Sequence, residues 1–115
     1  LTPFFTFAQP TIERFEPPYW WVDMHNTELQ IMIYGENIAH LKPEISYEGV
    51  TIKRTVLPEN NNYLFLYLDI DHETSPGEFT IDFKNNEKEV IVSKDYQLMA
   101  RDKDAAHRKG YDSSI

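Results

Sequence analysis

Hydrophobic and polar residues alternate along most of this chain with the two-residue period of a half-buried β-strand. The clearest run is Tyr63 to Ile70, in which leucines and one isoleucine would face one side and three aromatic side chains the other. A strand that is apolar on both faces is covered on both, or lies against a partner surface. Six further strands are predicted, over Thr11–Glu16, Leu29–Tyr34, Glu44–Tyr47, Val50–Leu57, Glu78–Lys84 and Lys88–Met99.

Turn-forming residues separate these runs, and no segment has the period of a helix. Gly35 and Asn37 close the second strand, the Pro58 to Asn62 cluster separates two others, and Pro76-Gly77 introduces the next. About seven short strands without helices predict an all-β fold, specifically an immunoglobulin-like antiparallel β-sandwich. The Cys-Trp-Cys pattern of antibody domains is absent, which excludes only that subclass. The predicted core between the sheets consists of Leu29, Ile31, Ile33, Leu64, Leu66, Leu68, Phe79, Ile81 and Phe83.

The most distinctive stretch is the aromatic triplet Tyr19-Trp20-Trp21, which follows Pro17-Pro18 and contains both tryptophans of the protein. Because prolines fix φ and lack a backbone donor, we expect a stiff corner outside any hydrogen-bonded ladder. One tryptophan is expected in the core and the other exposed or at an interface, with Met24 packed beside them. Tyr19, Trp20, Trp21 and Met24 are therefore the candidates for a carbohydrate site or a domain contact. The alternative is that all of these aromatic residues are core.

Length and composition narrow the classes of function. At 115 residues the chain is one domain by size, and it contains no cysteine, so neither disulfides nor thiolate chemistry are available. The net charge of -8 argues against nucleic acid and anionic membranes as partners. No stretch approaches the roughly 20 apolar residues of a membrane span. An acidic chain rich in tyrosine is compatible with a neutral ligand such as a sugar.

The first residues differ from the rest. Leu1 to Ala8 is uncharged and apolar, and Thr6-Phe7-Ala8 fits an export-signal cleavage site with Ala8 as the last residue removed. This interpretation places the protein in the periplasm or outside the cell; the alternative is an ordinary apolar first strand. The expected organisation is a signal-peptide remnant over residues 1–9, the sandwich domain over 10–101 and a linker over 102–115.

Catalytic or metal-binding motifs are scarce. The four histidines His25, His40, His72 and His107 lie far apart, and none has a second ligand at a recognised metal spacing. Asp69, Asp71 and Glu73 alternate as in a calcium loop, but Thr74 stands where an EF-type loop needs glycine, so a solvated strand end is expected instead. No acid pair, nucleophile or phosphate-binding loop is identifiable. We predict no catalytic residue, no metal, no cofactor and no enzymatic activity for this chain alone.

Several runs, in matching order, resemble the N-terminal domain of bacterial cyclomaltodextrinases and neopullulanases of the α-amylase superfamily. They cover the chain from about residue 10 to its end and are Pro10 to Met24, Glu28 to Gly35, Asn62 to Asp69, Pro76-Gly77 and Arg108 to Ser114. In those enzymes this domain is an immunoglobulin-like sandwich that precedes a (β/α)₈ catalytic barrel. The last run resembles the lead-in to the first barrel strand, so the catalytic residues would lie outside this sequence.

The resemblance implies a non-catalytic module of an exported hydrolase that acts on maltodextrins, cyclodextrins or pullulan. Its expected partners are its own catalytic barrel and a second subunit, with α-glucan as a further candidate ligand. The alternative is a stand-alone carbohydrate-binding or adhesion-type sandwich. A third interpretation is a structural module whose aromatic residues are all core.

Overall fold

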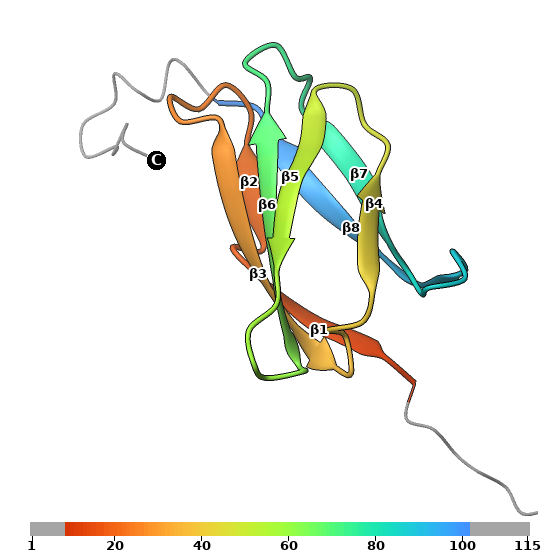
Figure 1. Cartoon of the computed structure of the whole chain (residues 1–115). Coiled ribbons are helices and arrows are strands. Elements are labelled where there is room, and N and C mark those ends of the chain that lie inside the picture. Colours follow the sequence, from red (N-terminus) through yellow and green to blue (C-terminus); the bar gives the residue numbers. More distant parts are fainter. Residues whose placement is uncertain (1–8, 102–115) are drawn as a thin grey trace, which may run out of the picture.

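The computed structural model describes residues 9–101, which form eight strands and contain no helix (Figure 1). The strands are β1 (Thr11–Glu16), β2 (Tyr19–Trp21), β3 (Glu28–Glu36), β4 (Lys42–Ile45), β5 (Val50–Val56), β6 (Tyr63–Ile70), β7 (Gly77–Lys84) and β8 (Val90–Met99). The predicted signal remnant over Leu1 to Ala8 and the predicted linker over 102–115 lie outside the described residues.

The strands form two four-stranded sheets that face one another as two layers (Figure 1). Sheet A has the order β1-β3-β6-β5 and sheet B the order β2-β8-β7-β4. All neighbouring strands are antiparallel except β2 and β8, which are parallel. The predicted all-β sandwich is thereby confirmed. The expected count of about seven strands is one short of the observed eight, because β2 was not expected.

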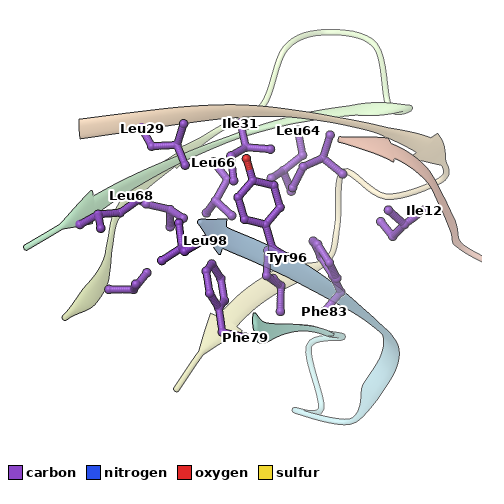
Figure 2. Packing of buried hydrophobic residues seen from close by; sticks show 14 of the residues in the cluster. Ile12, Leu29, Ile31, Leu64, Leu66, Leu68, Phe79, Phe83, Tyr96 and Leu98 are labelled. Atoms are coloured by element: carbon purple, nitrogen blue, oxygen red, sulfur yellow. The ribbon is translucent and has the colours of Figure 1, made fainter. Parts of the chain in front are cut away.

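The core lies between the two sheets, where alternating residues of facing strands meet (Figure 2). All nine residues predicted for the core are buried. Seven of them reach 0 % exposure: Ile31, Ile33, Leu64, Leu66, Leu68, Ile81 and Phe83. Tyr96 and Leu98 of β8 complete the layer. Strict alternation on β3, β6 and β7 is therefore what places their polar or aromatic residues on the outer faces of the sandwich.

The aromatic triplet lies in a ladder, so the prediction of a corner outside any ladder was wrong. Tyr19, Trp20 and Trp21 pair in parallel with Gln97, Leu98 and Met99, and the Val22 amide continues the pairing by donating to the Met99 carbonyl at 2.9 Å. The stiff segment is only Pro17-Pro18, which lack amide donors and carry the chain from sheet A to sheet B. The residues that follow, Tyr19 to Trp21, each carry a backbone amide donor again, and they pair with the free edge of β8.

The ends of β3, β4, β5, β7 and β8 also differ from the prediction, and β3 and β4 show the physical reasons. Gly35 lies inside β3 opposite Ile12, where the two strands shift register, and a Cβ at this position would overlap with the Thr11 carbonyl oxygen. The glycine is therefore required by close backbone approach and does not end the strand. The third strand is displaced toward the N-terminus, to Lys42–Ile45, and Tyr47 instead makes an isolated bridge to Val50.

Candidate functional site

The edge strand β2 sends its consecutive rings to opposite faces of sheet B. Trp20 pairs with the buried Leu98 and packs against the core cluster. Tyr19 and Trp21 point to the outer face, and their ring centroids are 5.4 Å apart at an interplanar angle of 69°. An edge-to-face arrangement of this kind is the one that the ring quadrupoles favour. Both tryptophans are half-buried, but only Trp20 packs against the core.

A methionine that the sequence did not single out joins the two outward rings. Met99 is the register partner of Trp21 and is 41 % exposed, and Tyr19 is 42 % exposed. We call Tyr19, Trp21 and Met99 the edge patch. The sequence signal that could have identified Met99 is the alternation on β8, which places Met99 on the same outward face as Gln97. Met24 lies in the loop after β2, is half-buried, and is not a member of the core cluster.

The loop that follows β2 is fastened on two sides. The Arg101 guanidinium Nη1 donates to the Asp23 carbonyl at 3.0 Å, and the Asp23 carboxylate lies 3.3 Å from Nδ1 of His72. Asp23 has a positive φ of 55°. The loop therefore connects the end of the edge patch to the β6–β7 loop and to the residue with which the described chain ends.

The strand behind the edge patch is anchored through Tyr96. Its ring packs edge-on against Phe15 at 5.8 Å between centroids, and its hydroxyl donates to the Pro17 carbonyl at 2.9 Å. Burial raises the pKa of Tyr96 far above its usual range, because a phenolate would lose its hydration there. Tyr96 is therefore a neutral structural donor that holds the link between β1 and β2.

Hydrogen bonds join several polar side chains of β7 and β8 on the outer face of sheet B. The Thr80 hydroxyl donates to Asp95 at 2.7 Å, and the Ser93 hydroxyl donates to Asp82 at 2.6 Å. The side-chain amide of Gln97, next to Tyr19, donates to the Leu98 carbonyl at 3.2 Å. Chemically, the edge patch offers aromatic ring and thioether surface, and the exposed Glu78 is the next residue in the same row of the ladder beyond Gln97.

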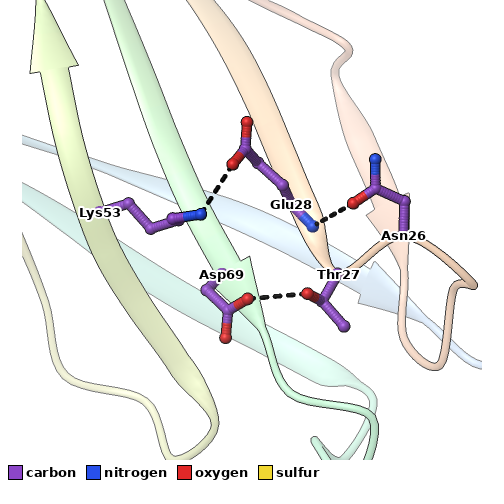
Figure 3. A network of polar contacts seen from close by, with 5 residues as sticks. All are labelled: Asn26, Thr27, Glu28, Lys53 and Asp69. Carbon is purple, nitrogen blue, oxygen red and sulfur yellow. Dashed lines mark hydrogen bonds and ion pairs between the residues drawn. The ribbon is translucent and has the colours of Figure 1, made fainter.

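The three alternating acids considered as a calcium loop do not converge. Asp69 accepts a hydrogen bond of 2.8 Å from the Thr27 hydroxyl on the outer face of sheet A (Figure 3). The Asp71 amide instead donates to the Gly49 carbonyl, and the Asp71 and Glu73 side chains are exposed in the loop after β6. Within residues 9–101 no group of three or more His, Cys, Asp or Glu side chains is arranged to hold a metal ion.

Next to Asp69, Lys53 and Glu28 form an ion pair on sheet A (Figure 3). Lys53 Nζ is 2.8 Å from Glu28 Oε2, and the Glu28 amide is capped by the side-chain oxygen of Asn26 at 3.0 Å. The hydrogen bond and the positive charge of Lys53 lower the pKa of the Glu28 carboxyl. A lowered pKa keeps this group ionised, which suits a surface ion pair and is the opposite of what a general acid needs.

A shallow hollow of about 380 Å³ lies between the β4–β5 and β6–β7 connections, lined by Tyr47, Glu48, Gly49, Asp71, Glu73, Thr74 and Ser75. Thr74 is only 7 % exposed, and its hydroxyl has no hydrogen-bond partner among the residues that the structure describes. The hydroxyl packs against Gly49, where a Cβ would overlap with it. The hollow is lined by no histidine, and no hydrogen bond joins the hydroxyl to the acidic side chains that line it, so it does not form a nucleophilic site.

The described residues thus define a class of protein: a β-sandwich domain with an aromatic patch on one edge. A family model described as cyclomaltodextrinase, N-terminal, matches residues 14–102, which is most of the chain. The chain belongs to this family, and the resemblance noted in the sequence is confirmed. Among the residues that the structure describes, no helix is long and apolar enough to cross a membrane.

Proposed function

We propose that this chain is the N-terminal module of an exported α-amylase-type hydrolase that acts on maltodextrins, cyclodextrins or pullulan. The observation that carries the proposal is the match of residues 14–102 to the cyclomaltodextrinase N-terminal family. A domain of this family precedes a catalytic domain, so the parent protein is a glycoside hydrolase. The module itself serves domain packing and subunit contact.

The strand order supports an immunoglobulin-like topology. If the strands other than β2 are lettered A to G in chain order, the sheet order β1-β3-β6-β5 becomes A-B-E-D, and β4-β7-β8 becomes C-F-G. These are the two sheets of constant-type immunoglobulin domains. The short β2 is then an additional strand that crosses from the edge of the first sheet to the edge of the second. We infer that the domain is an immunoglobulin-like variant of the β-sandwich on this ground.

Within the module, we assign the edge patch to contact with protein, with a second subunit as the partner. Tyr19 and Trp21 lie on a short hydrogen-bonded strand, so their rings lose little conformational freedom when they meet a partner. Direct α-glucan binding is the second candidate. It is disfavoured because sugar sites combine aromatic surface with convergent polar groups, whereas Gln97, Thr80 and Ser93 are engaged within sheet B.

Export is the further element of the proposal, with the periplasm or the exterior of the cell as the location. It is supported by the apolar run from Leu1 to Ala8 and by the cleavage pattern at its end. N-terminal sequencing of the protein recovered outside the cytoplasm of its host should begin at Gln9. A mature protein that begins upstream of Ala8 would contradict the export proposal without affecting the family assignment.

The proposed function is tested by expressing the parent gene and this chain side by side. The parent protein should hydrolyse maltodextrins, cyclodextrins or pullulan, and this chain alone should hydrolyse none of them. A parent protein without a glycoside hydrolase domain would support the alternative, a stand-alone carbohydrate-binding or adhesion-type sandwich. Affinity electrophoresis in maltodextrin gels separates the alternatives further. The contact assignment predicts that this chain binds maltodextrin no more tightly than about millimolar, roughly -4 kcal/mol, so that the gel does not retard it.

A further inference from the structure

The outer face of sheet A differs from that of sheet B, because aromatic and apolar side chains cover its centre. On this face Phe65 of β6 stands between Met32 of β3 and Val56 of β5, its register partners on either side. Tyrosines occupy the rows above and below: Tyr63 pairs with Tyr34, and Tyr67 pairs with Gln30 and Arg54. We call Met32, Tyr34, Val56, Tyr63, Phe65 and Tyr67 the sheet A face.

These side chains belong to the surface and do not contribute to the core. None of the six is a member of the core cluster or is packed against it, and Val56 is 41 % exposed. The others are half-buried because neighbours across the strands shield them; the Tyr34 and Tyr63 rings, for example, have centroids 5.0 Å apart. The sequence pattern had already required that this side of β6 be covered or lie against a partner.

Arginines border the face on both sides and hold its outer rings. The Arg54 guanidinium lies 3.9 Å from the centroid of the Tyr67 ring, and that of Arg14 lies 5.5 Å from the Tyr34 ring. An apolar centre with tyrosines and arginines around it is the composition of the energetically important part of protein interfaces. Aromatic side chains that are already held in place also lose little entropy when a partner covers them.

The charges at the rim are matched. Arg14 is 3.5 Å from Glu16, and Lys53 is 2.8 Å from Glu28. Although the whole chain carries a net charge of -8, Arg14 and Lys53 are thus paired on this face, and Arg54 lies against the Tyr67 ring, which limits the cost of removing water from it.

We propose that the sheet A face is the docking surface for the catalytic domain of the same polypeptide; this rests on the function proposed above. Four strands about 4.8 Å apart and about seven residues of some 3.4 Å each give a face of on the order of 400 Å². A standard interface between separate proteins takes about 800 Å² of accessible surface from each partner, so a second copy would have to contact more of the chain than the centre of this face. A covalently attached domain needs less, because the linker supplies an effective concentration in the millimolar range.

The chemistry of the face also argues against an α-glucan as its occupant. Arg54 covers the Tyr67 ring at 3.9 Å, so that ring is not free for a sugar to stack on. The central residues Met32, Phe65 and Val56 provide neither donors nor acceptors from their side chains. The edge patch lies on the outer face of the opposite sheet, so the two surfaces can serve two different protein partners at the same time.

Cysteine accessibility in the full-length parent enzyme tests this docking. The variants are Val56→Cys on the sheet A face and Val90→Cys as the matched control, since both are exposed valines on strands, at 41 % and 51 %, in opposite sheets. Each enzyme is treated with a maleimide, and peptide mass mapping assigns the modification to the introduced site. Each labelling rate is divided by the rate for the same variant unfolded in urea, which removes differences in the intrinsic reactivity of the two cysteines. The thermal unfolding midpoint of each variant verifies that it is folded.

We expect Val56→Cys to react at least tenfold more slowly than Val90→Cys, with the same ratio on dilution to a concentration at which light scattering shows a monomer. Equal rates overturn the docking. Protection that disappears on dilution identifies a second copy as the occupant and overturns it as well, and so does protection that appears only with maltodextrin. If the enzyme hydrolyses maltodextrins and the rates are equal, the docking fails while the proposed function stands.

A second measurement does not depend on labelling. Val56→Arg places a charge on the docking surface, and Val90→Arg places the same charge at the control position. We expect Val56→Arg to separate the unfolding of the sandwich from that of the catalytic domain in calorimetry, whereas Val90→Arg leaves a single cooperative transition. Identical thermograms for the two variants would contradict the docking.

Discussion

Trp20 and Trp21 are consecutive residues with ring centroids 5.5 Å apart, yet they serve opposite faces of sheet B. Trp20 packs against the core, whereas Trp21 faces outward beside Tyr19 and Met99. Their separation follows from the parallel ladder with β8, because side chains alternate across a strand. The two tryptophans therefore provide a matched pair, one structural and one available to a partner.

The alternation on β6 predicts how truncation affects the stability of this chain. Leu66→Ala should lower the free energy of unfolding by about 2–5 kcal/mol, because Leu66 is completely buried and leaves a cavity. Phe65→Ala is the control, and it should cost less although it removes more atoms, because the ring lies on the outer face. Urea unfolding followed by circular dichroism measures both. Equal costs would mean that the two faces of β6 are equally buried.

The hydrogen bond from Tyr96 to Pro17 predicts a second stability difference. Tyr96→Phe should cost about 1–2 kcal/mol, because the Pro17 carbonyl loses its partner at the link between the two sheets. Tyr47→Phe also removes a hydroxyl hydrogen bond, from the tyrosine to the Ser75 carbonyl, but that bond is exposed, so water replaces it and the cost should be smaller. If Tyr96→Phe is as stable as the unsubstituted chain, the hydrogen bond does not hold the link between β1 and β2.

The ion pair on sheet A predicts a titration. Because Lys53 holds the pKa of Glu28 below its ordinary value of 4.5, the carboxylate contributes stability above that pH, and the contribution is lost as the pH falls through the lowered pKa. Lys53→Met should therefore raise the Glu28 pKa, as followed by NMR of its side-chain carboxyl carbon. Lys84→Met is the control, since Lys84 pairs with Glu44 at 3.0 Å and should leave the Glu28 titration unchanged. An unaltered Glu28 pKa in Lys53→Met would refute the assignment.

Much of the fold follows from a period of two in the sequence. The limits of β1 and β6 are those predicted, and the predicted core residues are buried, because the alternation on these strands has a single interpretation: the apolar side faces inward. The third strand is displaced because Pro43 and Ile45 give too short a pattern to define its limits. Gly35 was taken as a terminator because sequence alone does not show that another strand approaches it closely.

The candidate site was only partly predictable. The sequence identified Tyr19 and Trp21, because aromatic residues next to two prolines are unusual. It did not predict the pairing of β2, since a three-residue strand has too few residues to show a period and its partner lies more than seventy residues away. Met99 was missed for the same reason, because its proximity to Trp21 depends on that long-range register. The sheet A face was visible only as an apolar outer side of one strand until β3 and β5 were placed beside it.

The central claim is that this domain uses Trp21 for contact with protein in an amylase-type hydrolase, and paired alanine substitutions test it most directly. In this chain alone, Trp20→Ala should lower the free energy of unfolding by about 3 kcal/mol, whereas Trp21→Ala should leave the chain folded. In the full-length enzyme, Trp21→Ala should weaken dimerisation, measured by sedimentation, or lower kcat/KM on maltodextrins. If both substitutions unfold this chain, or if Trp21→Ala leaves the assembly and kcat/KM of the enzyme unchanged, Trp21 is structural and the contact account is wrong.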